Sequence, residues 1–313
     1  MDCMDLEAQF GLLPFTSKQL LELDVTLRQW RLIRPELEKL RRGVYVIRLG
    51  PDDSTRHAQK VAATLMTKTD HFAVGASAIV LNGLPNPYFK SWDKIEPQIA
   101  GKQTRSSRGI LTSKAAPVPT PWGDTTDLIQ TATTITAELP LPQALMVTDA
   151  VARRLAGVAP DEHVTNAKRI ELSSEQCRTE VRRRLTRYSN ADALRLTNPA
   201  AEAPSESFYR GHMVLEGYDD PACGVPKIDA KGTYRFIDIL LDTLAIEVDG
   251  DEKLQTLQNL RDEKEREDDL RLVGLDFLRP RVETLYANPA AAMAQLAVKI
   301  DEVRLIRKFA QIL

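Results

Sequence analysis

Two apolar runs near the C-terminus, TYRFIDILL (residues 233–241) and TLAIEVDG (243–250), decide the fold of the last third of the chain. Both runs are rich in β-branched, aromatic and leucine residues, and a short turn near Asp242 separates them. They therefore predict two neighbouring antiparallel strands. Because side chains alternate along a strand, Glu247 and Asp249 are expected on one face of the second strand. Asp238 lies nine residues before Glu247, a separation consistent with pairing of the two strands.

The carboxylates in these runs are candidate site residues. An ionised carboxylate within an apolar strand is costly unless it lies at an edge, is paired or binds a metal. Cleavage of phosphodiesters by divalent metals needs hard oxygen ligands that converge on the ion. Asp238, Glu247 and Asp249 are therefore candidate ligands of Mg²⁺ or Mn²⁺. An Asp-Gly pair such as Asp249–Gly250 is also typical of a hairpin turn, so both interpretations of Asp249 stay open.

The segments around these strands predict an α/β (α+β) domain over residues 196–313. A helix is expected over 205–217, followed by a loop that contains Pro221, Gly224 and Pro226. After the two strands come a charged helix over about 255–272, a strand in LDFLRP (275–280) and a closing helix. Pro289 suits the first position of that closing helix. The expected order is therefore αββαβα.

Residues 1–50 have the pattern of a winged helix-turn-helix. Short helices are predicted after Thr16 and Thr26, and Pro35 ends the second of them. The segment LEKLRRGVYVI (37–47) predicts two strands around a tight turn. In this fold the second helix and the turn of the hairpin contact DNA, which makes five arginines candidate DNA-binding residues: Arg28, Arg31, Arg34, Arg41 and Arg42. A solvated face, or a module that binds protein, is the alternative for these arginines.

Residues 51–195 are predicted to form a mixed α/β connector. Helices are expected over 57–68, 76–83, parts of 125–155 and 173–188, and GILTS (109–113) resembles a strand. This region has no catalytic constellation. The arginines of the helix over 173–188 are best interpreted as a solvated face.

Composition limits the classes of function. The chain has 313 residues and a formal net charge of −2, so any contact with DNA must depend on local basic patches. Three cysteines and four histidines show no spacing typical of zinc sites. No apolar run approaches the ~18 residues of a membrane span, and the N-terminus lacks the features of a signal peptide, so a cytoplasmic protein is expected.

Several segments together resemble a known family. These are ESFYR (206–210), RFIDIL (235–240), IEVDG (246–250) and EKEREDDLRLVG (263–274). They resemble the C-terminal domain of a bacterial group with a PD-(D/E)XK-type, restriction-endonuclease-like fold related to very-short-patch repair endonucleases. In that group the domain often follows a winged helix similar to AbiEi-like antitoxins. The segments RRGVYVI (41–47), ASAIVLNGLP (76–85) and 125–145 are similar to that group as well.

The resemblance implies roles for individual residues. Asp238 and Glu247 would hold Mg²⁺ or Mn²⁺, and Glu206 would be the acid carried by a helix. Asp249 stands where the family usually has lysine and would replace it or add a ligand; the histidine that often follows the glycine is also missing here. Lys253 or Lys264, or else Arg266 or Arg279, would reach the attacking water or the phosphate.

Two functions follow from this resemblance. The first is a metal-dependent DNA endonuclease or nickase that is targeted by its winged helix and serves in defence or repair. The second is an antitoxin-like, DNA-binding transcriptional regulator whose nuclease fold is a degenerate scaffold or a dimerisation surface. The partners of the second function would be DNA, a cognate toxin protein and a second copy of the chain.

Overall fold

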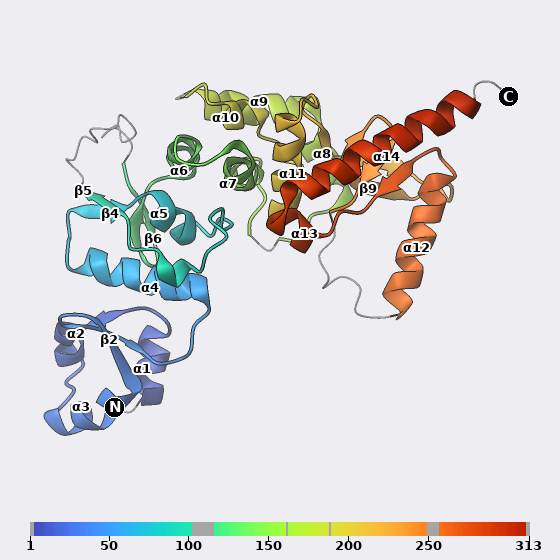
Figure 1. Ribbon diagram of the computed structural model, residues 1–313. Helices are drawn as coiled ribbons and strands as arrows, with labels where there is room; N and C mark the ends of the chain where they lie inside the picture. Colours follow the sequence, from blue (N-terminus) through green and yellow to red (C-terminus); the bar gives the residue numbers. More distant parts are fainter. Residues whose placement is uncertain (1–2, 102–115, 161, 188, 249–256, 311–313) are drawn as a thin grey trace. The chain divides into compact units, whose positions relative to one another are not determined.

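The computed structural model describes residues 3–101, 116–160, 162–187, 189–248 and 257–310 (Figure 1). The chain divides into two compact units, Met1–Ala137 and Glu138–Leu313, and both are mixtures of helices and strands. The predicted region 51–195 is thus split between the two units. The strand-like segment at 109–113 lies outside the described residues.

The first part of unit 1 has the elements α1 (Cys3–Phe10), β1 (Phe15–Thr16), α2 (Ser17–Glu22), α3 (Leu27–Ile33), β2 (Leu37–Arg41) and β3 (Val44–Ile47). A short 3-10 turn, Arg34–Glu36, follows α3. The strands form an antiparallel sheet in the order β1-β3-β2. The two predicted helices and the hairpin are confirmed, whereas α1 and β1 were not predicted.

Local capping explains where α2 and α3 begin. The hydroxyls of Thr16 and Thr26 accept hydrogen bonds from the backbone N–H groups of Gln19 and Gln29, and each glutamine side chain accepts from the N–H of its threonine. These reciprocal capping boxes satisfy N–H groups that have no partner within the helix. Beneath the two helices lies an apolar core built from Leu6, Phe15, Leu20, Val25, Ile33, Leu37 and Ile47.

The rest of unit 1 is organised around a second sheet. Its described elements are α4 (Asp53–Met66), β4 (His71–Ala73), α5 (Gly75–Leu81), β5 (Ile99–Gly101), β6 (Val118–Thr120), β7 (Gly123–Thr125) and α6 (Leu128–Thr136). The strand order is β5-β4-β7-β6. The helices predicted in this part of the chain are confirmed.

Unit 2 begins with five helices: α7 (Leu141–Leu155), α8 (Asn166–Ser173), α9 (Glu175–Thr186), α10 (Asp192–Leu196) and α11 (Pro204–Leu215). The predicted domain boundary at 195/196 falls inside this unit, because α11 packs along α7 and the two helices share a buried ion pair, Arg210–Asp149. The helix α9 is not simply a solvated face either. Arg182 donates to the backbone of Leu196 and Thr197 and pairs with Asp220, while Arg183 stays exposed.

The sheet of unit 2 contains β8 (Ala222–Ile228), β9 (Tyr234–Leu241), β10 (Leu244–Ile246) and β11 (Asp276–Leu278), in the order β11-β10-β9-β8. The predicted antiparallel pairing is confirmed, with Ile246 opposite Ile239. The strand β11 runs parallel to β10, and the crossover between them contains α12 (Leu257–Arg271). The chain then forms α13 (Val282–Ala287) and α14 (Pro289–Ala310). A continuous apolar core joins residues of α11, the sheet and α14.

One prediction in this sheet was wrong. The segment with Pro221, Gly224 and Pro226 was expected to be a loop, but it contains strand β8. The predicted order αββαβα therefore omits this strand, and it also omits the short helix α13. Proline is tolerated because β8 lies at the edge of the described sheet, where one side of the strand needs no N–H donors. Gly224 has φ +58°, and a Cβ there would lie 2.9 Å from the carbonyl oxygen of Ala200. Within the described part of the chain, no helix combines the length and the apolar character that crossing a membrane requires.

Candidate active site

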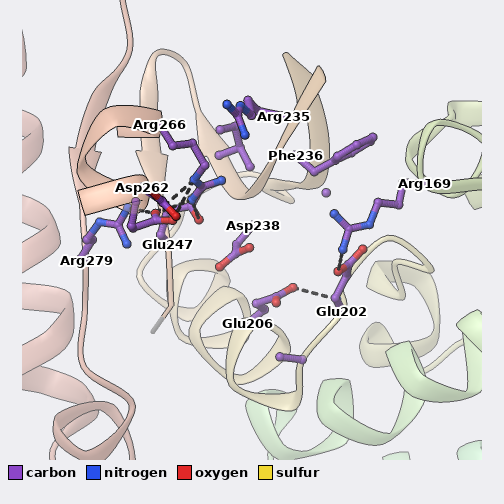
Figure 2. Close-up of a pocket in the computed structure, with 14 residues that line it drawn as sticks. Arg169, Glu202, Glu206, Arg235, Phe236, Asp238, Glu247, Asp262, Arg266 and Arg279 are labelled. Carbon is purple, nitrogen blue, oxygen red and sulfur yellow. Dashed lines mark hydrogen bonds and ion pairs between the residues drawn. The ribbon is translucent and has the colours of Figure 1, made fainter. Parts of the chain in front are cut away.

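A pocket of about 610 Å³ opens in unit 2 beside β9 and α11 (Figure 2). Its described lining includes six carboxylate and four guanidinium side chains. The formal charge of this lining is therefore −2 when all of these groups are ionised. Such a pocket repels a phosphate group unless a cation enters with it or some carboxylates are protonated.

Three of the predicted carboxylates meet in this pocket. Asp238 comes from β9, Glu247 follows the last residue of β10, and Glu206 lies in the first turn of α11. Figure 2 shows Asp238 between Glu206 on one side and Glu247 on the other. Asp238 Oδ2 accepts a hydrogen bond of 3.0 Å from the backbone N–H of Val248, two residues after the end of β10, and this bond holds the carboxylate in place.

Glu206 is deeply buried at one side of the pocket. Only 4% of its surface is exposed, and Oε2 accepts a 2.8 Å hydrogen bond from the backbone N–H of Glu202. Burial raises the pKa of Glu206 well above its usual range, and the negative charge of Asp238 raises it further. The unfavourable proximity of Glu206 and Asp238 would be relieved by a proton or by a bound cation.

These two carboxylates fit a divalent cation of the magnesium type. Mg²⁺ keeps several waters and is commonly held by one or two carboxylates together with phosphate oxygens of a substrate. Within the described ranges, no three acidic, histidine or cysteine side chains come together as a metal cluster. Asp249 and Lys253 lie outside those ranges.

Glu247 faces a group of arginines at the other end of the pocket. Its Oε2 accepts a hydrogen bond of 2.9 Å from Arg266 Nη2, and Arg266 also donates to Glu263 at 2.8 Å. Burial lowers the pKa of Arg266, but the charges of Glu247 and Glu263 outweigh this and raise it, so Arg266 is a permanent cation. Arg279, which follows β11, donates to Glu263 and Glu267.

Arg169 and Phe236 form a further wall of the pocket. The guanidinium carbon of Arg169, on α8, lies 5.1 Å from the centroid of the Phe236 ring. Arg169 Nη2 donates to Glu202 Oε2 at 2.6 Å. Arg235 lies nearby, and its Nε donates to Asp229 Oδ2 at 2.8 Å.

The other predicted residues have different positions. Lys264 is exposed on α12 and does not line this pocket, whereas Arg266 and Arg279 do. The sequence did not point to Arg169, which lies in none of the quoted segments, and it gave no role to Arg235 or Phe236 although both belong to RFIDIL. No signal in the sequence placed α8 beside β9.

The predicted DNA-binding arginines are on the surface of unit 1. Arg28 and Arg31 are exposed on α3, Arg34 is exposed directly after it, and Arg42 is exposed in the turn between β2 and β3. Arg41 is exposed as well, but its Nε donates to Thr64 Oγ1 at 2.9 Å.

Comparison with known proteins identifies no relative: no family model, no curated protein and no solved structure matches this chain.

Proposed function

We propose that this protein is a metal-dependent DNA endonuclease or nickase whose phosphodiesterase site is the pocket around Asp238. The observation that carries the proposal is the meeting of Glu206, Asp238 and Glu247 in one pocket that arginines also line. A pocket with two adjacent carboxylates and an overall negative lining suits an anionic substrate only when a divalent cation is present. Hydrolysis of a phosphodiester is a reaction that brings together an anionic substrate and a divalent cation.

Asp238 and Glu206 would hold the cation, which supplies a Lewis acid for the phosphate and lowers the pKa of a water when it is bound. The residues of the chain have separate tasks. Arg266, held by Glu247 and Glu263, presents a fixed positive charge toward the pocket. Preorganised charges of this kind stabilise the negative charge that develops on phosphate in the transition state.

The surface of unit 1 supports DNA as the substrate. Four residues separate α2 from α3, and Asp24 within this turn has φ +55°. Two short helices joined by such a turn are typical of the helix-turn-helix, whose second helix enters the major groove. The exposed Arg28 and Arg31 on α3 would bind phosphates or base edges there. We therefore assign a winged-helix function of DNA binding to residues 1–50.

A plasmid assay tests this proposal. The wild-type protein and the double variant Asp238→Asn/Glu247→Gln are incubated with supercoiled DNA and either Mg²⁺ or Mn²⁺. Nicking or linearisation by the wild type, lost in the double variant, is the expected result. Asp301→Asn is the matched control, because Asp301 is 81% exposed and lies outside the pocket, and it should cleave as the wild type does.

One observation favours a second function. Glu247 already has a cationic partner in Arg266, so this part of the pocket is stabilised without metal. Such an arrangement also suits a scaffold in a DNA-binding, antitoxin-like regulator with a cognate toxin or a second copy as partner. Protection of its own promoter in footprinting, without cleavage of any DNA in Mg²⁺ or Mn²⁺, would favour this regulator.

A further inference from the structure

We infer that Arg169 and Phe236 form a nucleotide subsite that takes an unpaired base of DNA next to the phosphate at Asp238. This inference rests on the proposed nuclease function and names the class of its substrate: DNA that is single-stranded or contains an unpaired nucleotide. Both residues line the same pocket as Asp238, and Figure 2 shows them on the side of Asp238 away from Glu247 and Arg266.

Phe236 is an aromatic residue of β9 that lines the pocket. Its neighbours Ile237 and Ile239 are completely buried in apolar clusters, whereas Phe236 is half-buried and its ring contributes to the wall of a polar, charged pocket. A half-buried ring that lines a pocket can stack with a ligand beside the Arg169 guanidinium, which already lies over the ring. Aromatic rings stack with any nucleobase, because every base has a π face, and this contact depends little on sequence.

Arg169 is suited to the same ligand. Its guanidinium group lies against the Phe236 ring and pairs with Glu202. Its side chain lines the pocket and is 34% exposed, so its accessible N–H groups can donate to an oxygen of a base or a phosphate. Arginine binds such planar acceptors and also stacks on aromatic faces.

The dimensions of the pocket limit which DNA can reach this wall. At about 610 Å³ the pocket has the size of sites that enclose small organic ligands, and thus suits a single nucleotide. A paired base is stacked between its neighbours inside the duplex and cannot contact a ring within a pocket unless it leaves the stack. A nucleotide that is already unpaired avoids that cost, so the pocket should favour single-stranded, bulged or mismatched DNA over a perfect duplex.

The test measures binding and not cleavage, in Ca²⁺, a divalent cation that carboxylates hold and that offsets the negative charge of the pocket. In Ca²⁺, fluorescence anisotropy compares three labelled DNAs of one sequence: a single strand, a perfect duplex and a duplex with a bulged nucleotide. Three variants are compared with the wild type. Phe236→Leu keeps an apolar side chain but cannot stack, Phe236→Tyr keeps an aromatic ring that can stack, and Arg169→Gln removes the guanidinium group. Tyr234→Leu is the matched control, because Tyr234 lies on the same strand, is 48% exposed and does not line the pocket.

We expect the wild type to bind the bulged duplex and the single strand more tightly than the perfect duplex. Phe236→Leu should weaken binding to these two DNAs by roughly 5- to 150-fold, the range of base–aromatic stacking, and leave the perfect duplex unchanged. Arg169→Gln should weaken binding to the same two DNAs. Phe236→Tyr and Tyr234→Leu should bind all three DNAs as the wild type does. Thermal unfolding of each variant verifies that it is folded.

Equal binding of all three DNAs by the wild type, or no binding at all, would overturn the subsite. It would also be overturned if Phe236→Leu bound each DNA as tightly as Tyr234→Leu. The plasmid assay separates the two proposals: cleavage of DNA with no preference for unpaired bases would leave the nuclease function intact. A preference for unpaired bases in Ca²⁺, without cleavage in Mg²⁺, would support the subsite alone.

Discussion

Arg210 on α11 donates to both carboxylate oxygens of Asp149 on α7, at 3.0 and 2.8 Å, and the two side chains are only 0% and 1% exposed. Arg210 also donates to Asp220 and to the backbone carbonyl of Leu196. This buried pair fixes α11, and thereby the first turn that carries Glu206, against the helices of unit 2. The candidate site depends on it although neither residue lines the pocket.

Replacement of Asp149 by alanine should destabilise the protein strongly. The change leaves the Arg210 charge buried with only its contacts to Asp220 and Leu196, and loss of one partner from a buried pair typically costs about 3–5 kcal/mol. Urea denaturation of Asp149→Ala measures this loss. Asp192→Ala is the control, because its pair with Arg195 is exposed, and its midpoint should hardly move. Equal midpoints for the two variants would contradict a structural role for the buried pair.

Glu206 should make the stability of the protein fall as pH rises. In the unfolded chain Glu206 titrates near 4.5, its ordinary value, whereas burial and Asp238 raise its pKa in the folded state. Between these two values the folded protein binds the additional proton, so the contribution of Glu206 is fully present below about pH 4.5 and is lost as pH rises through its folded pKa. Glutamine does not ionise, so Glu206→Gln does not lose stability in this way as pH rises. It should therefore be more stable than the wild type at about pH 8.

Urea denaturation of the wild type and of Glu206→Gln without metal, from about pH 4 to pH 8, measures how the difference between their stabilities changes with pH. Glutamine keeps an oxygen that can accept the N–H of Glu202, so the helix start is preserved. A gap between the two stabilities that does not grow with pH would show that Glu206 has an ordinary pKa.

Divalent metal should stabilise the wild type. A ligand that binds only the folded state adds RT ln(1 + [L]/Kd), which is about 2.7 kcal/mol at a concentration of a hundred times Kd. Millimolar Mg²⁺ or Mn²⁺ should thus raise the melting temperature of the wild type, and Asp238→Asn should abolish the shift. Asp301→Asn should retain it. The same shift in Asp238→Asn would place the metal elsewhere.

Arginines of α3 should contribute to DNA binding through phosphates. Each phosphate contact adds about 0.9 to the slope of log K against log salt concentration. Arg28→Gln and Arg31→Gln should each lower the magnitude of this slope by up to that amount in a gel-shift titration. Arg195→Gln, an exposed arginine of unit 2, is the control. Unchanged slopes for both α3 variants would mean that their positive charges belong to a solvated face.

Much of the fold was predictable because local sequence decided it. The capping boxes at Thr16 and Thr26 and the predominantly apolar runs of β9 and β10 specify their elements without help from the rest of the chain. Strand β8 was missed for the opposite reason. Gly224 and Pro226 weaken any local signal for a strand, and only pairing with β9, with Pro226 opposite Phe236, makes this segment extended.

The sequence pointed to three carboxylates of the described pocket lining and to Arg266 and Arg279, but not to Arg169 or Arg235. Asp238 and Glu247 stood out because carboxylates are costly within apolar strands. Arg169 had no such signal, because an arginine on a polar helix is ordinary until tertiary packing places it over Phe236. Lys264 seemed equally suitable in sequence, but it lies on the exposed side of α12, two residues from Arg266, which lines the pocket.

If the pocket around Asp238 cleaves DNA with the help of a divalent metal, the rate of cleavage depends both on that metal and on the Asp238 carboxylate. The most direct measurement is the initial rate of plasmid nicking as Mg²⁺ is titrated, for the wild type and for Asp238→Asn at equal concentrations. We predict a rate that rises with Mg²⁺ and saturates for the wild type, that is zero in EDTA, and that is lost in Asp238→Asn. Equal nicking by Asp238→Asn, or no nicking by the wild type at any Mg²⁺ or Mn²⁺ concentration, would contradict the claim.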